Sequence, residues 1–281
     1  SGKTTTLYSA IRHVQSEGVN IVTVEDPVEY RLPGIVQVQV HEKAGLTFAA
    51  ALRSILRQDP DVVLVGEIRD LETAEIAVQA SLTGHLVLST LHTNDAANAV
   101  TRLADIGVEG FKIGSSLRGV VAQRLMRTLC TTCREERSES VAPKLHRWIS
   151  EGSGLQRAVG CAECAMTGYR GRFSIVEILK ITPAIERLIT SGATADKIAD
   201  AASADGMLSM WHSGLAHVIR GESTIEELLR VVDMPQDDEM KSGEVRARPS
   251  AGAGPATESS GRESAPVGVV SPAMERLFGI R

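Results

Sequence analysis

The fold of this protein is decided by residues 61–97, which read DVVLVGEIRDLETAEIAVQASLTGHLVLSTLHTNDAA. The apolar run at 61–66 is continuous, which is typical of a strand buried on both faces of a parallel sheet. Asp70 can cap a helix that Gly84 would end, and residues 85–91 form a second apolar run of the same kind. Strand, helix and strand at this spacing predict a doubly wound α/β sheet.

The chain before this stretch continues the same alternation. Residues 4–17 predict a helix, and residues 19–25 form a β-branched run that predicts a strand. Thr47 is a good N-cap for a further helix, whose apolar residues recur on one face. We therefore assign residues 1–128 to one α/β core.

The rest of the chain divides into three parts of different composition. Residues 129–180 hold two C-x-x-C pairs, a polar insertion between them and the return to the core. Residues 181–233 have a helical pattern and predict a small helical subdomain. Residues 234–281 are rich in Gly, Pro, Ser and Ala, and we expect a disordered tail because such a segment buries too little apolar area. A short docking helix around residues 274–278 is the alternative for part of that tail.

Composition excludes several classes of function. The chain has 281 residues, of which 43% are apolar and 3% aromatic, and its formal net charge is −5. It therefore offers neither the basic surface nor the stacking platform of a typical nucleic-acid binder. No apolar run reaches the roughly 18 residues of a membrane span, so we expect any membrane role to come through a partner. The chain begins without Met or a signal peptide, at what looks like an interior point of a longer protein.

The first residues match the end of a phosphate-binding loop. Gly2-Lys3-Thr4 precedes a predicted helix. In such loops, backbone N–H groups at the helix start hold phosphate oxygens, a lysine reaches the β- and γ-phosphates, and a hydroxyl binds Mg²⁺. Three residues alone more often mark an ordinary helix start, so this interpretation depends on the residues that follow.

Carboxylates and histidines recur next to the predicted strands. They are Glu25, Asp26, Glu29, Glu67, His85 and His92. Open α/β sheets bind ligands beyond the carboxyl ends of their strands, where a carboxylate can hold Mg²⁺ or polarise the water that attacks a γ-phosphate. Each residue also has an ordinary explanation, such as an acidic turn, a helix-capping charge or a packed histidine. Their recurrence at successive strands favours a nucleotide site.

Four segments make a family resemblance specific: SGKTTTLYSA at 1–10, VTVEDPVEY at 22–30, the stretch around 61–97, and the cysteine pairs. Over about residues 1–233, the chain resembles the ATPases of type II secretion and type IV pilus assembly. The resemblance implies a RecA-like P-loop ATPase domain, here incomplete at its amino-terminal end. It also implies a homo-hexameric ring that hydrolyses ATP with Mg²⁺ to drive pilin or pseudopilin assembly.

The resemblance assigns the phosphate and magnesium groups by position. Gly2, Lys3 and Thr4 match the Walker A loop, with Lys3 on the phosphates and the Thr4 hydroxyl on Mg²⁺. Glu67 matches the acid of an atypical Walker B motif, which orients the metal or its waters.

The resemblance also assigns the catalytic groups. Glu25, Asp26 and Glu29 match an acidic box that supplies the catalytic glutamate; we favour Glu29 for that role and keep Glu25 as the alternative. His85 and His92 match the histidine box, with His92 as the expected sensor of the γ-phosphate.

Three arginines match phosphate-binding or intersubunit positions less specifically. They are Arg53, Arg57 and Arg69, and the sequence does not choose between them.

The four cysteines predict a structural zinc site. Cys130 and Cys133 are separated from Cys161 and Cys164 by 27 residues. Thiolates from two tight turns can surround Zn²⁺ tetrahedrally, and we expect the insertion between them to loop out. Free buried thiols are the alternative. The pairs resemble the tetracysteine element of assembly ATPases, which similar retraction ATPases lack, and so favour assembly or secretion.

The chain departs from the family at its start, where the first strand of the domain is absent. That absence would leave a neighbour such as 19–25 or 85–91 without a partner. We therefore expect these 281 residues alone to hydrolyse ATP poorly and to aggregate.

The resemblance implies partners and a location. The partners are inner-membrane platform proteins of a secretion or pilus machine, and the location is cytoplasmic, peripheral to the inner membrane. Alternative functions are a catalytically impaired, zinc-stabilised scaffold and a pilus retraction ATPase. Nucleic-acid binding through the cysteine pairs is the weakest alternative, since the insertion offers one Trp for stacking.

Overall fold

The computed structural model describes residues 2–150 and 153–235. The helices are α1 (Lys3–Val14), α2 (Phe48–Ile55), α3 (Leu71–Leu82), α4 (Ala96–Ile106), α5 (Gly110–Ser116), α6 (Pro183–Thr190), α7 (Ala195–Ala204), α8 (Met210–Ile219) and α9 (Ile225–Val231). The strands are β1 (Ile21–Glu25), β2 (Val36–Gln39), β3 (Val62–Val65), β4 (Leu86–Ser89), β5 (Gly119–Leu129), β6 (Glu135–Glu136), β7 (Gln156–Arg157) and β8 (Tyr169–Lys180). The tail and docking helix expected after residue 235 lie outside the described residues.

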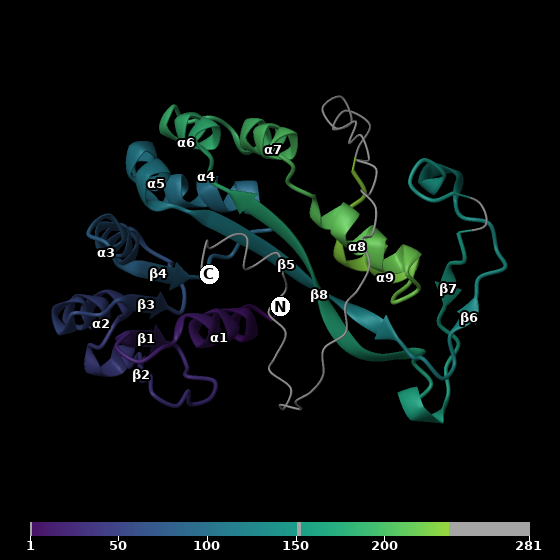
Figure 1. Ribbon diagram of the computed structural model, residues 1–281, viewed down its shortest axis with the longest axis horizontal. Helices are drawn as coiled ribbons and strands as arrows, with labels where there is room; N and C mark the ends of the chain where they lie inside the picture. Colours follow the sequence, from purple (N-terminus) through teal and green to yellow (C-terminus); the bar gives the residue numbers. More distant parts are fainter. Residues whose placement is uncertain (1, 151–152, 236–281) are drawn as a thin grey trace, which may run out of the picture. The chain divides into compact units, whose positions relative to one another are not determined.

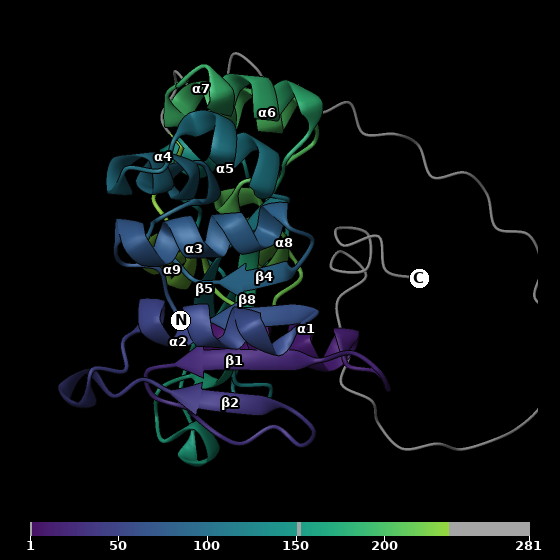
Figure 2. The ribbon, with the colours of Figure 1, turned by 90° about the vertical axis from the view of Figure 1, so that its left-hand side faces the viewer.

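The core is a parallel sheet with strand order β2-β1-β3-β4, which confirms the predicted α/β fold. Val22 pairs with Val36 on one side and with Val63 on the other, and Val63 pairs with Val87. Figure 2 shows the arrows of β1, β2 and β4 pointing the same way. The carboxyl ends of β1, β3 and β4 therefore share one edge of the sheet, which we call the carboxyl edge.

Helices cover both faces of this sheet, which explains the continuous apolar runs in its strands. Tyr8 and Ile11 of α1 pack on Ile21 of β1 and on alternate residues of β3. The side chains on the other face, including Val22 and Val24, pack against α2. In Figure 1, α1 lies on one side of the strands and α2 and α3 on the other.

Strand β4 differs from its prediction as a fully buried strand. All four of its residues are only half-buried, because within the described residues only β3 pairs with it. The hydroxyl of Ser89 is buried without a hydrogen-bond partner in the part of the chain that the structure describes. Strand β1, by contrast, is paired on both sides, so of the two segments expected to lack a neighbour, 19–25 has one on each side and 85–91, which forms β4, lacks one among the described residues.

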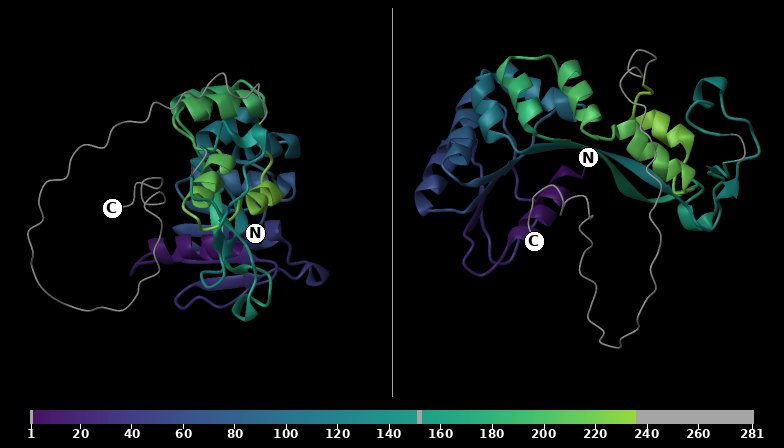
Figure 3. Two further views of the ribbon diagram at one scale, coloured as in Figure 1. Left: turned by 90° about the vertical axis from the view of Figure 1, so that its right-hand side faces the viewer. Right: turned by 45° about the horizontal axis from the view of Figure 1, so that its top comes forward.

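A long antiparallel ribbon, which was not predicted from the sequence, follows the sheet. It consists of β5 and β8, which pair from Gly119 opposite Lys180 to Leu129 opposite Tyr169, with a shift of register between Arg127 and Leu129. Figures 1 and 3 show it running from α4 and α6 past α8 and α9 toward β6 and β7. The ribbon joins segments on either side of the expected boundary at 128/129, and the domain boundaries themselves stay predictions.

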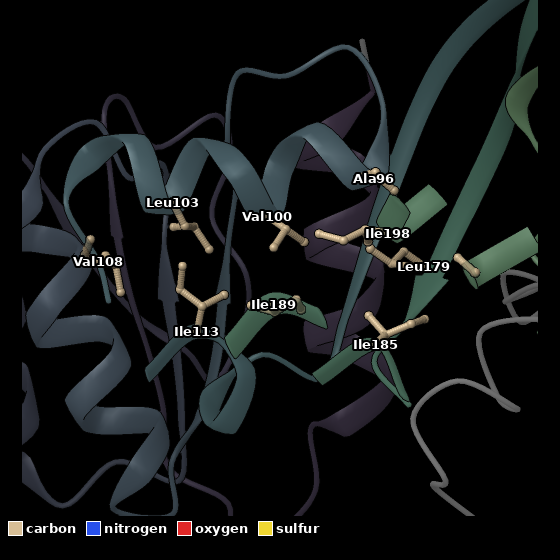
Figure 4. Close-up of a cluster of buried hydrophobic side chains, with 12 residues drawn as sticks. Ala96, Val100, Leu103, Val108, Ile113, Leu179, Ile185, Ile189 and Ile198 are labelled. Atoms are coloured by element: carbon tan, nitrogen blue, oxygen red, sulfur yellow. The ribbon is translucent and has the colours of Figure 1, made fainter. Parts of the chain in front are cut away.

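The four C-terminal helices belong to two different cores. Helices α6 and α7 place Ile185, Ile189 and Ile198 against Val100 of α4 and Ile113 of α5 (Figure 4). Helices α8 and α9 build a second core with the inner face of the ribbon. The predicted helical character of residues 181–233 is therefore present, but its apolar faces do not form a core of their own.

Candidate functional site

Two residues predicted from different strands meet at the carboxyl edge. Glu67 follows β3, and His92 follows β4. The Nε2 atom of His92 lies 3.1 Å from Oε2 of Glu67, although the two residues are 25 apart in the sequence. Nη2 of Arg69 donates to the other oxygen, Oε1, at 2.5 Å. The side chain of Glu67 is 14% exposed and that of His92 is 74% exposed. At the carboxyl edge, a largely buried carboxylate is therefore paired with an exposed imidazole.

Electrostatics keep Glu67 ionised at neutral pH. The hydrogen bond from Arg69 holds the pKa of Glu67 below its usual range, burial opposes this, and His92 adds to the lowering. A carboxylate in this state can bind a cation or its waters. Because Arg69 occupies Oε1, a metal ion that used both oxygens would have to displace the guanidinium.

Glu25 lies at the end of β1 but is enclosed. It is 4% exposed. Its Oε1 accepts from Thr23 Oγ1 at 2.5 Å and from Gln37 Nε2 at 3.1 Å, and its Oε2 accepts from the hydroxyl of Tyr8. Burial, with the hydrogen bond and charge of Glu25, raises the pKa of Tyr8 to about 12. The carboxylate of Glu25 thus links α1 to β1.

The other two acids of the box are accessible. Asp26 and Glu29 are exposed in the turn that follows β1. Hydrogen bonds from the backbone of Glu29 and Tyr30 lower the pKa of Tyr8, partly offsetting the larger effects of burial and Glu25, so this turn lies directly against α1.

The start of α1 is held by the ribbon. Gly2 has a left-handed conformation, with φ of 77°, and a Cβ at this position would lie 3.1 Å from Nε2 of Gln123. The hydroxyl of Thr6 donates to Oε1 of Gln123 at 2.8 Å. Lys3 and Thr4, between these contacts, are half-buried. The end of the candidate phosphate loop therefore sits against β5.

The neighbouring residue of β5 reaches the histidine loop, which we define as residues 90–95. Nη2 of Arg124 donates to the backbone oxygen and to Oδ1 of Asn94, both at 3.1 Å. Contacts thus run from Thr6 of α1 through Gln123 and Arg124 to the histidine loop, which carries His92. This pair was not predicted, although two adjacent polar residues inside the otherwise apolar stretch 119–126 were a signal for it.

Three other predicted residues lie elsewhere. His85 precedes β4, at the opposite edge of the sheet from His92, with its Nδ1 2.9 Å from the backbone oxygen of Ala80. Arg53 lies on α2 and pairs with Glu72 of α3 at 2.5 Å, and both side chains are more than half exposed. Arg57 lies in the short helical turn Leu56–Gln58, before the amino end of β3.

The four cysteines form a tetracysteine cluster, made of Cys130, Cys133, Cys161 and Cys164. Their sulfur atoms all lie within 4.8 Å of one another, and three of the separations are 3.8 to 3.9 Å. A tetrahedral zinc ion with Zn–S bonds of about 2.3 Å needs sulfurs about 3.8 Å apart. The donor set and its spacing therefore fit a structural Zn²⁺ site.

Backbone N–H groups support the ionised form of one sulfur in this cluster. Although burial raises the pKa of Cys164, N–H groups of Cys161 and Gly168 lower it to about 6. Both groups donate to the Cys164 sulfur at 3.2 Å. The thiolate is the form that binds metal ions.

The insertion between the cysteine pairs does not loop out, contrary to the prediction. Leu145, Ile149 and Leu155 are buried in the core of α8 and α9, against Trp211. Trp148 packs edge-to-face with Trp211, with ring centroids 6.0 Å apart. Leu145, Trp148 and Ile149 do recur at helical spacing, but periodicity does not say which distant core an apolar face packs against, so this packing could not be predicted from the sequence.

Comparisons with known proteins agree with the fold. The family described as type II/IV secretion system protein matches residues 1–230. The chain is 55% identical to the type II secretion system protein HxcR of Pseudomonas aeruginosa, over 82% of this chain and 46% of the relative. It is 47% identical to the type IV pilus assembly ATPase PilB of Thermus thermophilus, over 82% of this chain and 26% of that protein. The chain thus spans half or less of these relatives.

Solved structures resemble it as well. The pilus retraction motor PilT with bound ADP has a TM-score of 0.63 and 30% identity, over 84% of this chain and 59% of that one. The ATPase DotB of Legionella pneumophila, with a TM-score of 0.57 and 21% identity, shares the fold over 82% of this chain and 56% of its own. Each helix in the described residues is too short or too polar to cross a bilayer.

Proposed function

The chain belongs to the type II/IV secretion system protein family, and on that premise we propose that it binds ATP with Mg²⁺ and hydrolyses it to drive assembly of pilin or pseudopilin subunits. The observation that carries the proposal is the meeting of Glu67 and His92 at the carboxyl edge, joined through the ribbon to the start of α1. Parallel sheets bind nucleotides at this edge.

The start of α1 would hold the phosphates. Its backbone N–H groups lack partners within the first turn and attract anions. Lys3 would contact the β- and γ-phosphates, and Thr4 would hold Mg²⁺ together with Glu67. The metal would neutralise charge that develops on the phosphates.

Glu29 would be the base that orients the attacking water. It is exposed in the turn after β1, whereas the oxygens of Glu25 are already occupied by Tyr8, Thr23 and Gln37. Asp26, in the same turn, would add negative charge near the metal. His92, hydrogen-bonded to Glu67, would contact the γ-phosphate, so that the position of the histidine loop would depend on whether ATP is bound.

The arginines would have unequal roles. Arg69 pairs with Glu67 and would exchange this partner for a phosphate when nucleotide binds. Arg53, on an exposed helix surface, would act between subunits of a homo-hexamer. His85 lies at the opposite edge and has no part in nucleotide binding in this proposal.

The tetracysteine cluster supports assembly or secretion over retraction. The residues fit Zn²⁺, which would be structural because four thiolates leave no open position for water. Inner-membrane platform proteins would be the partners, so the protein would work at the inner membrane without spanning it. A retraction motor is the second candidate because PilT shares the fold at 30% identity.

Two variants of the whole protein test the nucleotide site. Lys3→Ala should weaken binding of a fluorescent ATP analogue by about 10- to 100-fold, the loss expected for a charged hydrogen bond. Glu29→Gln should keep that binding and lower phosphate release by about 10²- to 10⁴-fold. Glu17→Gln, an exposed acid beyond the other end of α1, is the control and should change neither. Unchanged binding by Lys3→Ala would refute the nucleotide site, and unchanged turnover by Glu29→Gln would remove that residue from the mechanism.

A further inference from the structure

One buried carboxylate joins the two halves of the described chain. Glu177 lies on β8, opposite Ala122 of β5, and the next two pairs of the ribbon are those of Gln123 and Arg124. It is 7% exposed. Its Oε1 accepts from the backbone N–H of Ala96 at 2.9 Å, and its Oε2 accepts from that of Met210 at 3.2 Å.

Both donors are the first residues of helices. Ala96 begins α4, and Met210 begins α8. The N–H groups of a first helical turn have no partner within the helix, and the positive end of the helix dipole favours a negative charge there. The two oxygens of Glu177 thus fix the starts of two helices that are far apart in the sequence, and neither helix can shift without changing a bond to the same side chain.

The first of these helices is an extension of the histidine loop. Only residues 93–95 separate His92 from Ala96. Within this connection, Asn94 is held by Arg124, and the side chain of Asp95 caps α4 by accepting from the Asn98 N–H at 2.7 Å. Because this connection is short and is held by these hydrogen bonds, a displacement of His92 would also displace the N–H of Ala96.

The second helix leads into the C-terminal core. Trp211, the residue after Met210, is 1% exposed and packs in the core shared by α8, α9 and the insertion between the cysteine pairs. The ribbon also holds α8 through Val176, whose N–H donates to the Ser213 hydroxyl at 3.2 Å. A movement at the start of α8 therefore passes into a rigidly packed group of elements.

We propose that Glu177 is a positioning residue that couples the histidine loop to α8, so that nucleotide binding at the carboxyl edge is transmitted to the C-terminal core through this side chain. The inference rests on the proposed function, since it needs a nucleotide that acts on His92. It assigns Glu177 no contact with the nucleotide.

The test compares two buried glutamates in the whole protein. Glu177→Gln keeps the shape of the side chain but replaces one acceptor oxygen with an NH₂ group, which cannot accept from a helix N–H. Glu227→Gln is the matched control: Glu227 is also buried and also binds the ribbon, through Arg127, but its bonds lead to α9 and not to α4. Amide hydrogen exchange is measured at the starts of α4 and α8, with and without a non-hydrolysable ATP analogue, beside kcat and KM.

The wild-type protein should show nucleotide-dependent exchange at both helix starts. In Glu177→Gln the nucleotide-dependent change in exchange at α4 should persist, while the change at α8 should fall about tenfold. The kcat should fall about 10- to 100-fold, the loss expected when a mutation far from the chemistry misplaces a group, and KM should stay within about threefold. Glu227→Gln should retain both changes and a kcat within about threefold, even where its melting temperature is lower.

A second pair of variants removes the donor instead of the acceptor, and it applies even if Glu177→Gln does not fold. Met210→Pro deletes the N–H at a position where helices accept proline, and the extended Ser209 before it suits a proline. Met210→Ala loses the same side chain but keeps the N–H. The response at α8 should be lost in Met210→Pro and kept in Met210→Ala.

Equal responses in Met210→Pro and Met210→Ala, an unaltered response in Glu177→Gln, or an equal loss in Glu227→Gln would overturn the coupling role. These results would leave the proposed function intact, because the wild-type protein would still hydrolyse ATP. A wild-type protein that neither binds nor hydrolyses ATP would refute the proposed function, and the coupling with it.

Discussion

Replacing Glu25 tests whether this residue stabilises the contact between α1 and β1 or acts as the catalytic glutamate. Glu25→Ala removes the acceptor of three side-chain hydrogen bonds, two of which come from the buried residues Tyr8 and Thr23. A buried donor left without an acceptor costs about 1–3 kcal/mol. Two such donors give a loss of about 2–6 kcal/mol in the free energy of unfolding.

The assay is thermal unfolding followed by circular dichroism, supported by a titration of Tyr8. A loss of about 4 kcal/mol corresponds to a melting temperature lower by about 8–16 °C for a protein of this size. The pKa of Tyr8, about 12 in the wild-type protein, should fall because the hydrogen bond and charge of Glu25 are gone, although burial remains. The control, Glu29→Ala, changes an exposed side chain and should alter stability by no more than about 0.5 kcal/mol.

One outcome would refute this assignment of the two acids. If Glu25→Ala unfolds at the same temperature as Glu29→Ala and yet has no ATPase activity, then Glu25 is the catalytic glutamate. In that case nucleotide binding must expose the buried side chain of Glu25. Loss of stability in Glu25→Ala, with turnover lost in Glu29→Gln, supports a structural role for Glu25 and a catalytic role for Glu29.

Further predictions concern the metal and the pH dependence. Chelation should release one Zn²⁺ per chain, detected with a chromogenic indicator. It should also change the tryptophan fluorescence, because Trp148 and Trp211, the two tryptophans of the chain, lie in the core that the insertion shares with α8; zinc release without a spectral change would show that the cluster does not support this core. Although burial opposes ionisation, Arg230 and Arg127 lower the pKa of Glu227 to about 2. Its stabilising contribution is complete above the unfolded pKa of about 4.5 and is lost as pH falls through about 2. The wild-type protein should therefore lose more stability than Glu227→Gln between pH 4.5 and 2 in thermal melts, and parallel curves would contradict the low pKa.

Local patterns in the sequence were enough to predict the sheet and most of the polar residues at its carboxyl edge. The continuous apolar run before Glu67 predicted a strand covered on both faces, and the β-branched run before Glu25 predicted a second strand. Parallel strands bring their carboxyl ends together whatever the details of packing. The spacing of the cysteines predicted their cluster for a similar reason, since two tight turns leave four sulfurs little freedom once they meet.

Only the tertiary structure decided which of these side chains are available for chemistry. Glu25 and Glu29 are alike in sequence, but one is enclosed by Tyr8 from another helix and the other is exposed. His85 is separated from His92 by the length of β4. The contacts of Glu177 depend on a ribbon that pairs residues about 50 positions apart, and such long-range pairings leave no periodic trace in the sequence.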